Sequence, residues 1–371
     1  MKSFITLYPY SKNIHLVKDV GIIPWMFSIL GNFRSELVTC ELDYYCYLNK
    51  ETPGLTISFL PKTDINISEK VFSVCKQYLV TNAQTIDILN LYDISSSIVK
   101  LARLYKRYNP KGKLYIKLDR GFNYPISKNP FKRLRERFLE LSLTKHADLI
   151  SAESTDSCAF FKKHTFLRPE YIPNGYSKKI DFLPELKNNT ILFVGDVSID
   201  PKRIDLVLDA FSTICETTNN LDWKLKLIGP VKEDFQVFWH HFCLDHSEIV
   251  SRIEIAGPQY DRELLDEEYQ KASVFVLASD HESFGIVLPE AIRAGCVPVV
   301  SSGIASANDI TDLCRVGFIF ERGSAQSLAS ALACAMEKAG DTIFLRQIVE
   351  HSESFYWPTI CKKIKNLLGE P

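Results

Sequence analysis

Two glutamates, Glu282 and Glu290, are the residues whose type and spacing most clearly predict chemistry in this chain. They follow the apolar run Val274–Ala278, which predicts a buried parallel strand, and they bracket Ile286, where a helix-like pattern begins. A loop that follows a strand and opens a helix is where α/β proteins bind phosphorylated ligands. Carboxylates repel phosphates, so these two are predicted to accept hydrogen bonds from the hydroxyl groups of a sugar or a ribose.

The residues between the two glutamates predict how such a loop would bind its ligand. Gly285 allows the backbone to turn closely. The backbone amides of Phe284, Gly285 and Ile286 would then lie at the start of the helix, where they could hold a sugar or phosphate oxygen. The alternative is that the glutamates are two solvated carboxylates near a helix amino terminus, where acidic residues are favoured in any case.

Strand-like and helix-like runs alternate along the whole chain, which is the pattern of βαβ units and parallel sheets. The polar stretch 173–189 separates two sets of expected strands and therefore predicts the domain boundary. We expect an α/β protein with two Rossmann-like, doubly wound domains, 1–178 and 179–371, that face a central cleft. The last helix, at about 353–371, is expected to pack back toward the first domain. The ligand belongs at the carboxyl ends of the strands.

Composition narrows the class of protein. The 371 residues suit two domains, and 46% hydrophobic with 24% charged residues is typical of a soluble globular protein. A net charge of −1 argues against binding to nucleic acid. The ten cysteines lack paired C-x-x-C spacing, so no zinc site or disulfide framework is expected, and the compartment is predicted to be the reducing cytoplasm. The longest apolar stretch, 22–30, contains Pro24 and cannot span a bilayer.

Five segments in register resemble one enzyme family. The glutamate pair, with Phe284, Gly285 and Pro289 between its members, resembles the paired-glutamate motif of retaining glycosyltransferases of family 4, which are nucleotide-sugar enzymes with the two-domain GT-B fold. The other segments resemble the same family in the same order: 172–175, 191–195 with 201–205, 295–301, and 317–332 followed by 355–357. The resemblance is close over residues 145–365 and holds only in outline before them.

The resemblance implies roles for the two glutamates. Glu282 would contact a hydroxyl of the transferred sugar, and Glu290 would hold the ribose of the nucleotide. Gly303 stands where the family usually has a pair of glycines, and it alone is expected to allow a close backbone approach to the diphosphate. Ser283, in the same loop as Glu282, is counted with the residues that bind the donor.

The same resemblance places Lys202 and Arg203, which follow Gly195, beside the diphosphate of the donor. Departure of a nucleoside diphosphate leaves negative charge on a phosphate, and fixed cations stabilise that charge in the transition state. The family usually has a basic residue directly after the glycine, where this chain has Asp196, and Arg203 is expected to compensate. The alternative is a pair of surface cations at the start of a helix that begins near Pro201.

Residues of the first domain are expected on the acceptor side. Asp119 ends a predicted strand near the position where the family commonly has a histidine close to the reacting sugar. It is expected to orient the acceptor hydroxyl or to act as its general base. The alternative, equally open, is that it caps the turn before Gly121. Lys18, Asp19 and Gly21, at the start of a predicted helix, are assigned to the same side.

Two histidines are further candidates for the missing family histidine. His281 directly precedes Glu282 and could hydrogen-bond the donor, and His15 lies in the first domain. A single histidine in a loop is more often structural or simply exposed, so this alternative stays open.

The segment 131–141 predicts a basic amphipathic helix, with Phe131, Leu134, Phe138 and Leu141 on one face. Such a helix could rest on anionic lipid, which would suit an enzyme with a lipid-linked acceptor. The alternative is an internal helix with a solvated basic face.

The expected function is transfer of a sugar from a nucleotide-diphosphate sugar to a glycan or lipid-linked acceptor, with retention of configuration. The expected setting is assembly of lipopolysaccharide O-antigen or capsule-type surface polysaccharide, in the cytoplasm or peripherally at the cytoplasmic membrane face. No cofactor is expected, because the donor is a co-substrate, and no metal, because an Asp-x-Asp pattern at a strand end is missing. The rivals are a GT-B nucleotide-sugar epimerase and a non-catalytic sugar- or nucleotide-binding relative.

Overall fold

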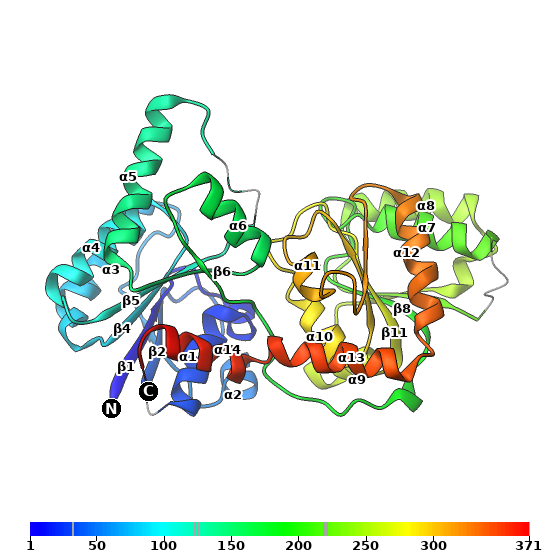
Figure 1. Cartoon of the computed structure of the whole chain (residues 1–371), viewed down its shortest axis with the longest axis horizontal. Coiled ribbons are helices and arrows are strands. Elements are labelled where there is room, and N and C mark those ends of the chain that lie inside the picture. Colours follow the sequence, from blue (N-terminus) through cyan, green and yellow to red (C-terminus); the bar gives the residue numbers. More distant parts are fainter. Residues whose placement is uncertain (32, 122–123, 125, 218–221, 371) are drawn as a thin grey trace. The chain divides into compact units, whose positions relative to one another are not determined.

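The computed structural model describes residues 1–31, 33–121, 124, 126–217 and 222–370. The chain folds into two units (Figure 1). The first unit comprises Met1–Ser177 together with Trp357–Pro371, and the second comprises Lys178–Tyr356. The first unit is thus built from both ends of the chain, because its last helix, α14 (Trp357–Leu367), packs on α1 (Asp19–Leu30).

Parallel strands form the sheet of the first unit, in the order β3-β2-β1-β4-β5-β6-β7. Neighbours β1 and β4 follow one another in space but not in sequence, so the direction of winding reverses between them. The strands are β1 Lys2–Leu7, β2 Phe33–Thr39, β3 Thr56–Phe59, β4 Ile88–Tyr92, β5 Lys113–Leu118, β6 Leu149–Ala152 and β7 Glu170–Tyr171. The other helices are α2 Tyr47–Glu51, α3 Ser68–Asn82, α4 Ser96–Tyr108, α5 Pro130–His146 and α6 Thr155–His164.

Helices cover both faces of this sheet, which explains why its central strands β1, β4 and β5 bury side chains at consecutive positions rather than at alternate ones. One face presents Ile5, Leu89 and Ile116 to a core that α3 and α4 complete. The opposite face presents residues such as Phe4 and Tyr115 to α1 and α14. A slip of one residue in register would exchange these two sets of side chains.

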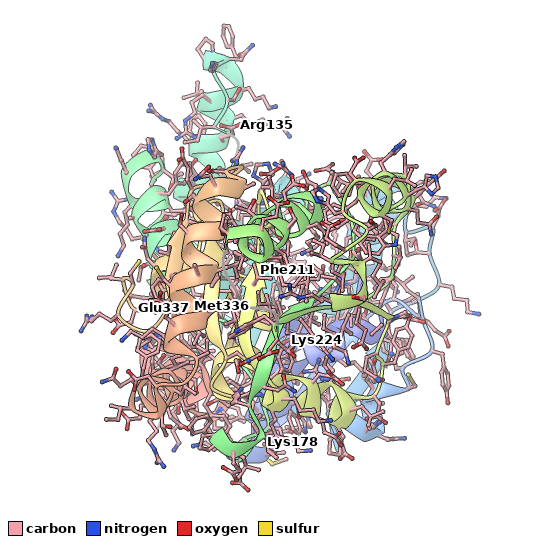
Figure 2. The ribbon with its side chains drawn as sticks, turned by 90° about the vertical axis from the view of Figure 1, so that its right-hand side faces the viewer. Arg135, Lys178, Phe211, Lys224, Met336 and Glu337 are labelled. Atoms are coloured by element: carbon pink, nitrogen blue, oxygen red, sulfur yellow. The ribbon has the colours of Figure 1, made fainter. Side chains whose placement is uncertain are left out.

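The second unit repeats the design with parallel strands in the order β10-β9-β8-β11-β12-β13, and its winding reverses between β8 and β11. Figure 2 shows Phe211 on α7 and Met336 on α12, two helices that pack side by side. The strands are β8 Asn188–Val194, β9 Lys224–Ile228, β10 Ile253–Gly257, β11 Ala272–Leu277, β12 Val297–Ser301 and β13 Phe318–Phe320. The helices are α7 Ile204–Thr217, α8 Glu233–Asp245, α9 Arg262–Lys271, α10 Val287–Arg293, α11 Ala307–Ile310, α12 Ala325–Lys338 and α13 Thr342–Ser352.

The predicted α/β class with two doubly wound domains is confirmed. Four elements were not predicted, namely the short helices α2 and α11, the strand β7 and the helix α13. β7 is only Glu170–Tyr171, too short to stand out as an apolar run, and α13 begins at Thr342, in a stretch for which no element was expected. Within the described residues, no helix has both the length and the apolar character that a membrane span requires.

Candidate active site

Three loops of the second unit meet at the carboxyl ends of β8, β11 and β12. The amide of Asp280, after β11, donates to the carbonyl oxygen of Pro201, after β8, over 2.9 Å. The amide of Ala305, after β12, donates to the carbonyl oxygen of Glu282 over 3.2 Å. The hydroxyl of Ser306 donates to the carbonyl of Phe284. Because β8 and β11 flank the reversal of winding, these loops occupy the position where doubly wound sheets bind ligands.

Two of the predicted glycines hold these loops together. A Cβ atom on Gly303 would lie 2.4 Å from the carbonyl oxygen of Asp280, so only glycine allows the two loops to approach so closely. Gly285 has a φ of 78°, in the left-handed region, and a Cβ there would lie 2.8 Å from a methyl group of Leu277. Both glycines are therefore required for the packing of the loops against one another, independently of any ligand.

The loops bring Lys202 and Glu282 into an ion pair, between the ammonium group and Oε1 of the carboxylate. The two side chains are 21% and 22% exposed, so solvent and a ligand can reach both. The hydroxyl of Ser279 lies 3.5 Å from the same carboxylate oxygen. The structure therefore brings together a predicted phosphate-binding cation and a predicted sugar-binding carboxylate.

Arg203 directly precedes α7 and is held by two carboxylates. Its Nη2 lies 2.9 Å from Oδ2 of Asp205, and its Nη1 lies 3.3 Å from Oδ2 of Asp280. The hydrogen bonds that Arg203 donates to Asp205, together with the negative charge of Asp205, raise the pKa of Arg203. The φ of Arg203 is 54°, a conformation that costs a residue with a Cβ of the order of 1 kcal/mol or more. Neither Asp205 nor Asp280 was among the predicted site residues.

Glu290 is the predicted site residue whose surroundings differ most from the expectation. It is buried on α10, and its two carboxylate oxygens are already bound, Oε1 by the guanidinium of Arg262 and Oε2 by the hydroxyl of Tyr269 at 3.2 Å. The charge of Glu290 raises the pKa of Arg262, and burial raises that of Tyr269. Contact between Glu290 and a ribose stays a prediction, and it requires Arg262 or Tyr269 to share the carboxylate.

The remaining predicted site residues of this unit differ in how far their side chains are exposed to solvent. His281 is exposed, whereas Ser283 and Ile286 are half-buried beside it in the loop. The ring of Phe284 is buried and lies 6.1 Å from that of Phe355, so this side chain belongs to the core. Gly195 directly follows β8 and has a φ of 152°. A Cβ atom on the neighbouring Gly229 would collide with the carbonyl of Gly195.

The first unit has a buried charged cluster at the carboxyl ends of its strands. The ammonium of Lys117, on β5, lies 2.6 Å from Oε1 of Glu153, 3.0 Å from Oδ1 of Asn174 and 3.3 Å from Oδ2 of Asp19. Lys117 is fully buried and Glu153 nearly so. Burial alone would lower the pKa of Lys117, but the charges of Glu153 and Asp19 overcome that effect and raise it.

Sequence reasoning identified Asp19 but missed Lys117 and Glu153. The sequence does contain an indication of this cluster, because Lys117 lies within the apolar run Leu114–Leu118. A lysine that is buried in a central strand needs a partner of opposite charge. The cluster holds two carboxylates for one cation. Within the described parts of the chain, Oε2 of Glu153 and the hydroxyl of Tyr92 are buried and have no hydrogen-bond partner.

The other acceptor-side candidates lie around this cluster. Asp119 is exposed directly after β5, and its charge adds to the effect of burial, which is the main cause of the raised pKa of Tyr92. Lys18 is the residue that precedes α1. A Cβ on Gly21 would lie 2.5 Å from the Cα of Leu16, so Gly21 is required for packing of α1 on the preceding turn.

His15 interacts electrostatically with Asp19 and Asp119, but its imidazole is not positively charged. Its Nδ1 accepts a hydrogen bond from the backbone amide of Lys12 at 2.8 Å, which leaves the proton on Nε2. Burial and the neighbouring charge of Lys18 lower the pKa of His15. His15 is thus a neutral hydrogen-bond donor at physiological pH.

The excess negative charge of the buried cluster predicts a specific pH dependence. Burial raises the pKa of Glu153, so this group stabilises the fold below its ordinary value of 4.5, and that contribution is lost as pH rises through the raised pKa. Glu153→Gln removes the titration. As the pH rises from about 5 to about 8, we expect the free energy of unfolding of this variant to increase relative to that of the natural protein. Urea unfolding of both proteins at the two pH values measures this difference, and a constant difference would contradict the prediction.

One group of residues has the arrangement of a metal site. Oxygen and nitrogen atoms of Glu216, His246 and Glu248 lie within 4.8 Å of one another. Glu216 lies in the last turn of α7, about 18 Å along the helix from its first residue, Ile204, which directly follows Arg203. Any cation held there would be remote from the strand-end loops.

Comparison with known proteins agrees with this geometry. Residues 177–351 match the model of the family described as glycosyl transferases group 1. The match spans nearly all of the second unit and supports a glycosyltransferase. No curated protein matches the sequence closely enough to count as a relative.

Solved structures resemble the whole chain. HepE of Anabaena in complex with UDP has 16% sequence identity and a TM-score of 0.74, with all of both chains covered. A glycosyltransferase of Rickettsia africae ESF-5 has 14% identity and a TM-score of 0.76, with 100% of this chain and 99% of that chain covered. The apo lipopolysaccharide outer core galactosyltransferase WaaB has 17% identity and a TM-score of 0.71, with the same coverage. At these identities the likeness shows the fold alone, which is GT-B.

Proposed function

We propose that this protein is a glycosyltransferase that moves a sugar from a nucleotide-diphosphate sugar to a hydroxyl group of an acceptor, with retention of configuration. The observation that carries the proposal is the ion pair of Lys202 and Glu282, formed by loops that follow β8 and β11 in a unit that matches glycosyl transferases group 1. HepE of Anabaena, which has the same fold, binds UDP. A nucleoside diphosphate is accordingly the leaving group of the proposed reaction.

The proposed chemistry needs few protein groups. The bond between the anomeric carbon and the diphosphate oxygen breaks, and the negative charge that develops on the phosphate is stabilised by Lys202, Arg203 and the amino terminus of α7. The acceptor hydroxyl attacks the same face of the sugar and passes its proton to the departing phosphate. Positioning of the two substrates supplies much of the remaining rate acceleration.

The ion pair itself suggests how the donor is bound. Without a ligand, the charge of Lys202 is compensated by Glu282. A diphosphate carries more negative charge than one carboxylate and would draw the ammonium group toward itself. Glu282 would then be released to accept a hydrogen bond from a sugar hydroxyl. Binding of the phosphate and selection of the sugar would therefore be coupled through one side chain.

We further propose that the acceptor is lipid-linked and that α5 rests on an anionic membrane surface. The side chains of Phe131 and Phe138 are 84% and 65% exposed, and Leu134 and Leu141 on the same face are also exposed. The amino-terminal part of α5 projects from its unit, and Arg135 lies on this part (Figures 1 and 2). Both acidic residues of α5, Glu136 and Glu140, lie on another face and pair with Arg133. The exposed side therefore combines apolar residues with cations, as a membrane-binding helix does.

A thermal-shift screen tests the donor site. We expect one of UDP, GDP or ADP, at about a hundred times its dissociation constant, to stabilise the protein by about 2.7 kcal/mol. Glu282→Gln keeps the shape of the side chain and removes its charge. It should reduce the shift given by the matching nucleotide sugar more than the shift given by the free nucleotide.

The matched control is Lys224→Met, at the first residue of β9, on the opposite edge of the sheet from the strand-end loops (Figure 2). This variant should respond to every ligand as the natural protein does. If no nucleotide stabilises the natural protein, the proposed reaction loses its basis. Tight nucleotide binding without sugar transfer to any acceptor would point to a binding protein instead.

A further inference from the structure

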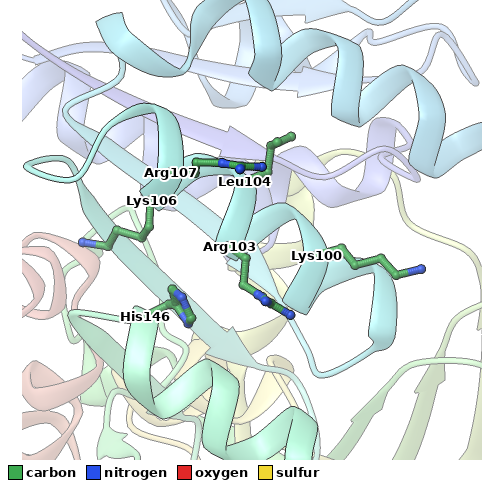
Figure 3. Close-up of a pocket in the computed structure, with 6 residues that line it drawn as sticks. All are labelled: Lys100, Arg103, Leu104, Lys106, Arg107 and His146. Atoms are coloured by element: carbon green, nitrogen blue, oxygen red, sulfur yellow. The ribbon is translucent and has the colours of Figure 1, made fainter.

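The first unit has a cavity of about 590 Å³ that the proposed reaction does not use. It is lined by Lys100, Arg103, Leu104, Lys106 and Arg107 of α4 and by His146, the last residue of α5. Figure 3 shows Arg103 and His146 in the space between the two helices. The cavity lies toward the carboxyl end of α4. Arg107 is about 16 Å along this helix from Ser96, which comes just after the loop at the carboxyl end of β4.

The charges around this cavity are unbalanced. Lys100, Arg103 and Arg107 share one face of α4, at the spacing at which like charges on a helix repel one another. Neither Arg103 nor Arg107 forms a hydrogen bond or ion pair with any residue that the structure describes. The ammonium group of Lys100 contacts only the ring of Phe72, at 5.5 Å from its centroid, among the described residues.

The other polar groups of the cavity do not relieve this repulsion. Lys106 is already neutralised, since its ammonium lies 2.6 Å from Oδ2 of Asp148 and 2.7 Å from the carbonyl of Gly112. The Nδ1 atom of His146 lies 2.6 Å from the carbonyl oxygen of Ser142, to which it donates, so Nε2 is left for a ligand. No carboxylate is among the lining residues. The chain as a whole has a net charge of −1, so this concentration of cations is local.

We propose that this cavity is a binding site for a phosphate ester, held by Arg103, Arg107 and Lys100. Guanidinium groups bind phosphate oxygens in pairs, and a bound phosphate would offset the repulsion along α4. A cavity of this volume exceeds what a bare phosphate needs and leaves room for an organic part of glycerol or sugar size. Leu104 provides an apolar wall for that part. The site is independent of the proposed glycosyl transfer.

Two sources could supply the phosphate ester. One is a phospholipid head group, which is favoured by α5, because the helix that carries the exposed Phe131 and Phe138 also ends at the cavity with His146. The other is a soluble phosphate ester from solution. Both present the same phosphate to the same cations, so a membrane and a small molecule are used as separate probes.

The test compares the full-length protein with Arg103→Gln/Arg107→Gln. Both arginines are exposed, so the fold should be retained, which circular dichroism checks. The charge-matched control is Lys162→Gln/Lys163→Gln, two exposed cations of α6 in the same unit. One probe is glycerol 3-phosphate, titrated by calorimetry. The other is flotation with phosphatidylcholine vesicles, with and without phosphatidylglycerol.

We expect the arginine variant to bind the phosphatidylglycerol vesicles about thirtyfold more weakly than the natural protein, since each cation near an anionic surface contributes about 1 kcal/mol. The control should bind as the natural protein does. If the natural protein binds glycerol 3-phosphate and the arginine variant does not, this also supports the site. It would show that a phosphate ester is bound without a membrane. Binding to vesicles alone identifies the lipid as the source.

A third variant, Phe131→Ser/Phe138→Ser, separates the cavity from the apolar face of α5. It should weaken vesicle binding but leave any binding of glycerol 3-phosphate unchanged. The proposal is overturned if neither probe binds, or if the arginine variant binds both as the lysine control does. None of these measurements uses sugar transfer, so a failure here is distinct from a failure of the proposed reaction.

Discussion

Replacing Lys202 with methionine is expected to lower kcat for sugar transfer by about two to three orders of magnitude. Loss of one group that stabilises developing negative charge in an enzyme site costs about 2.7–4 kcal/mol of the activation free energy. Lys202 is the cation of the β8 loop that already meets Glu282, and no other lysine or arginine forms an ion pair with Glu282 among the described residues. The measurement is the rate of nucleoside diphosphate release with the donor that the binding screen identifies.

The stability of this variant should change little, which separates chemistry from folding. Lys202 and Glu282 are each about one-fifth exposed, and ion pairs that solvent screens contribute about 0–1 kcal/mol. Lys224→Met again provides the control, because it removes an equal charge and volume from the opposite edge of the same sheet. If the two methionine variants have the same kcat, Lys202 does not stabilise the leaving group.

An arginine at the same position refines this test. Lys202→Arg keeps the charge but replaces a point charge on a flexible stem by a planar fork. We expect it to restore a part of the lost rate. A result as low as that of the methionine variant would mean that the geometry of the ammonium group matters as much as its charge.

Replacing Lys117 with methionine is expected to destabilise the first unit by about 3–5 kcal/mol, the cost of leaving a buried charge without its partner. The natural lysine compensates Glu153 and Asp19, both of which are buried at the carboxyl ends of the strands. Methionine has nearly the same length, so the loss of charge rather than of packing dominates the effect. This is a large fraction of the stability of an ordinary domain.

Hydrogen exchange of the full-length protein shows whether the loss of stability is confined to the first structural unit. Amides of β5, which pair with β4 and β6, should exchange much faster in the variant, whereas those of β8 and β11 in the second unit should not. Lys113→Met, on the same strand, is the matched control. Lys113 is 42% exposed and lies 3.5 Å from Asp148, so its removal should cost no more than about 1 kcal/mol.

An unchanged exchange pattern in Lys117→Met would mean that Glu153 takes up a proton instead of remaining charged. That outcome would agree with the raised pKa of Glu153 and would appear as a proton uptake on mutation. Lys117→Met in combination with Glu153→Gln should recover part of the lost stability, because the double change removes one of the two carboxylates that were left without a partner.

Several features of this protein could be predicted from its sequence because they are local. The strands β9 and β13 and the helices α5, α9 and α12 coincide with runs of apolar residues that have the matching period. Gly285, with its positive φ, marks the turn between β11 and α10 because no other residue adopts that conformation freely. The position of Lys202 and Glu282 at strand ends followed from the same local patterns.

The partners of these residues depend on contacts between distant parts of the chain, and only the tertiary structure decided them. Glu290 was assigned to a ribose, but α9 brings Arg262 and Tyr269 to its carboxylate. The charges of Lys117, Glu153 and Asp19 are far apart in sequence and meet because β5 and β6 end, and α1 begins, at one edge of the sheet. Local periodicity determines which segments are strands and helices, whereas the order of strands in each sheet determines which polar side chains meet. That order depends on long-range pairing, which no local pattern encodes.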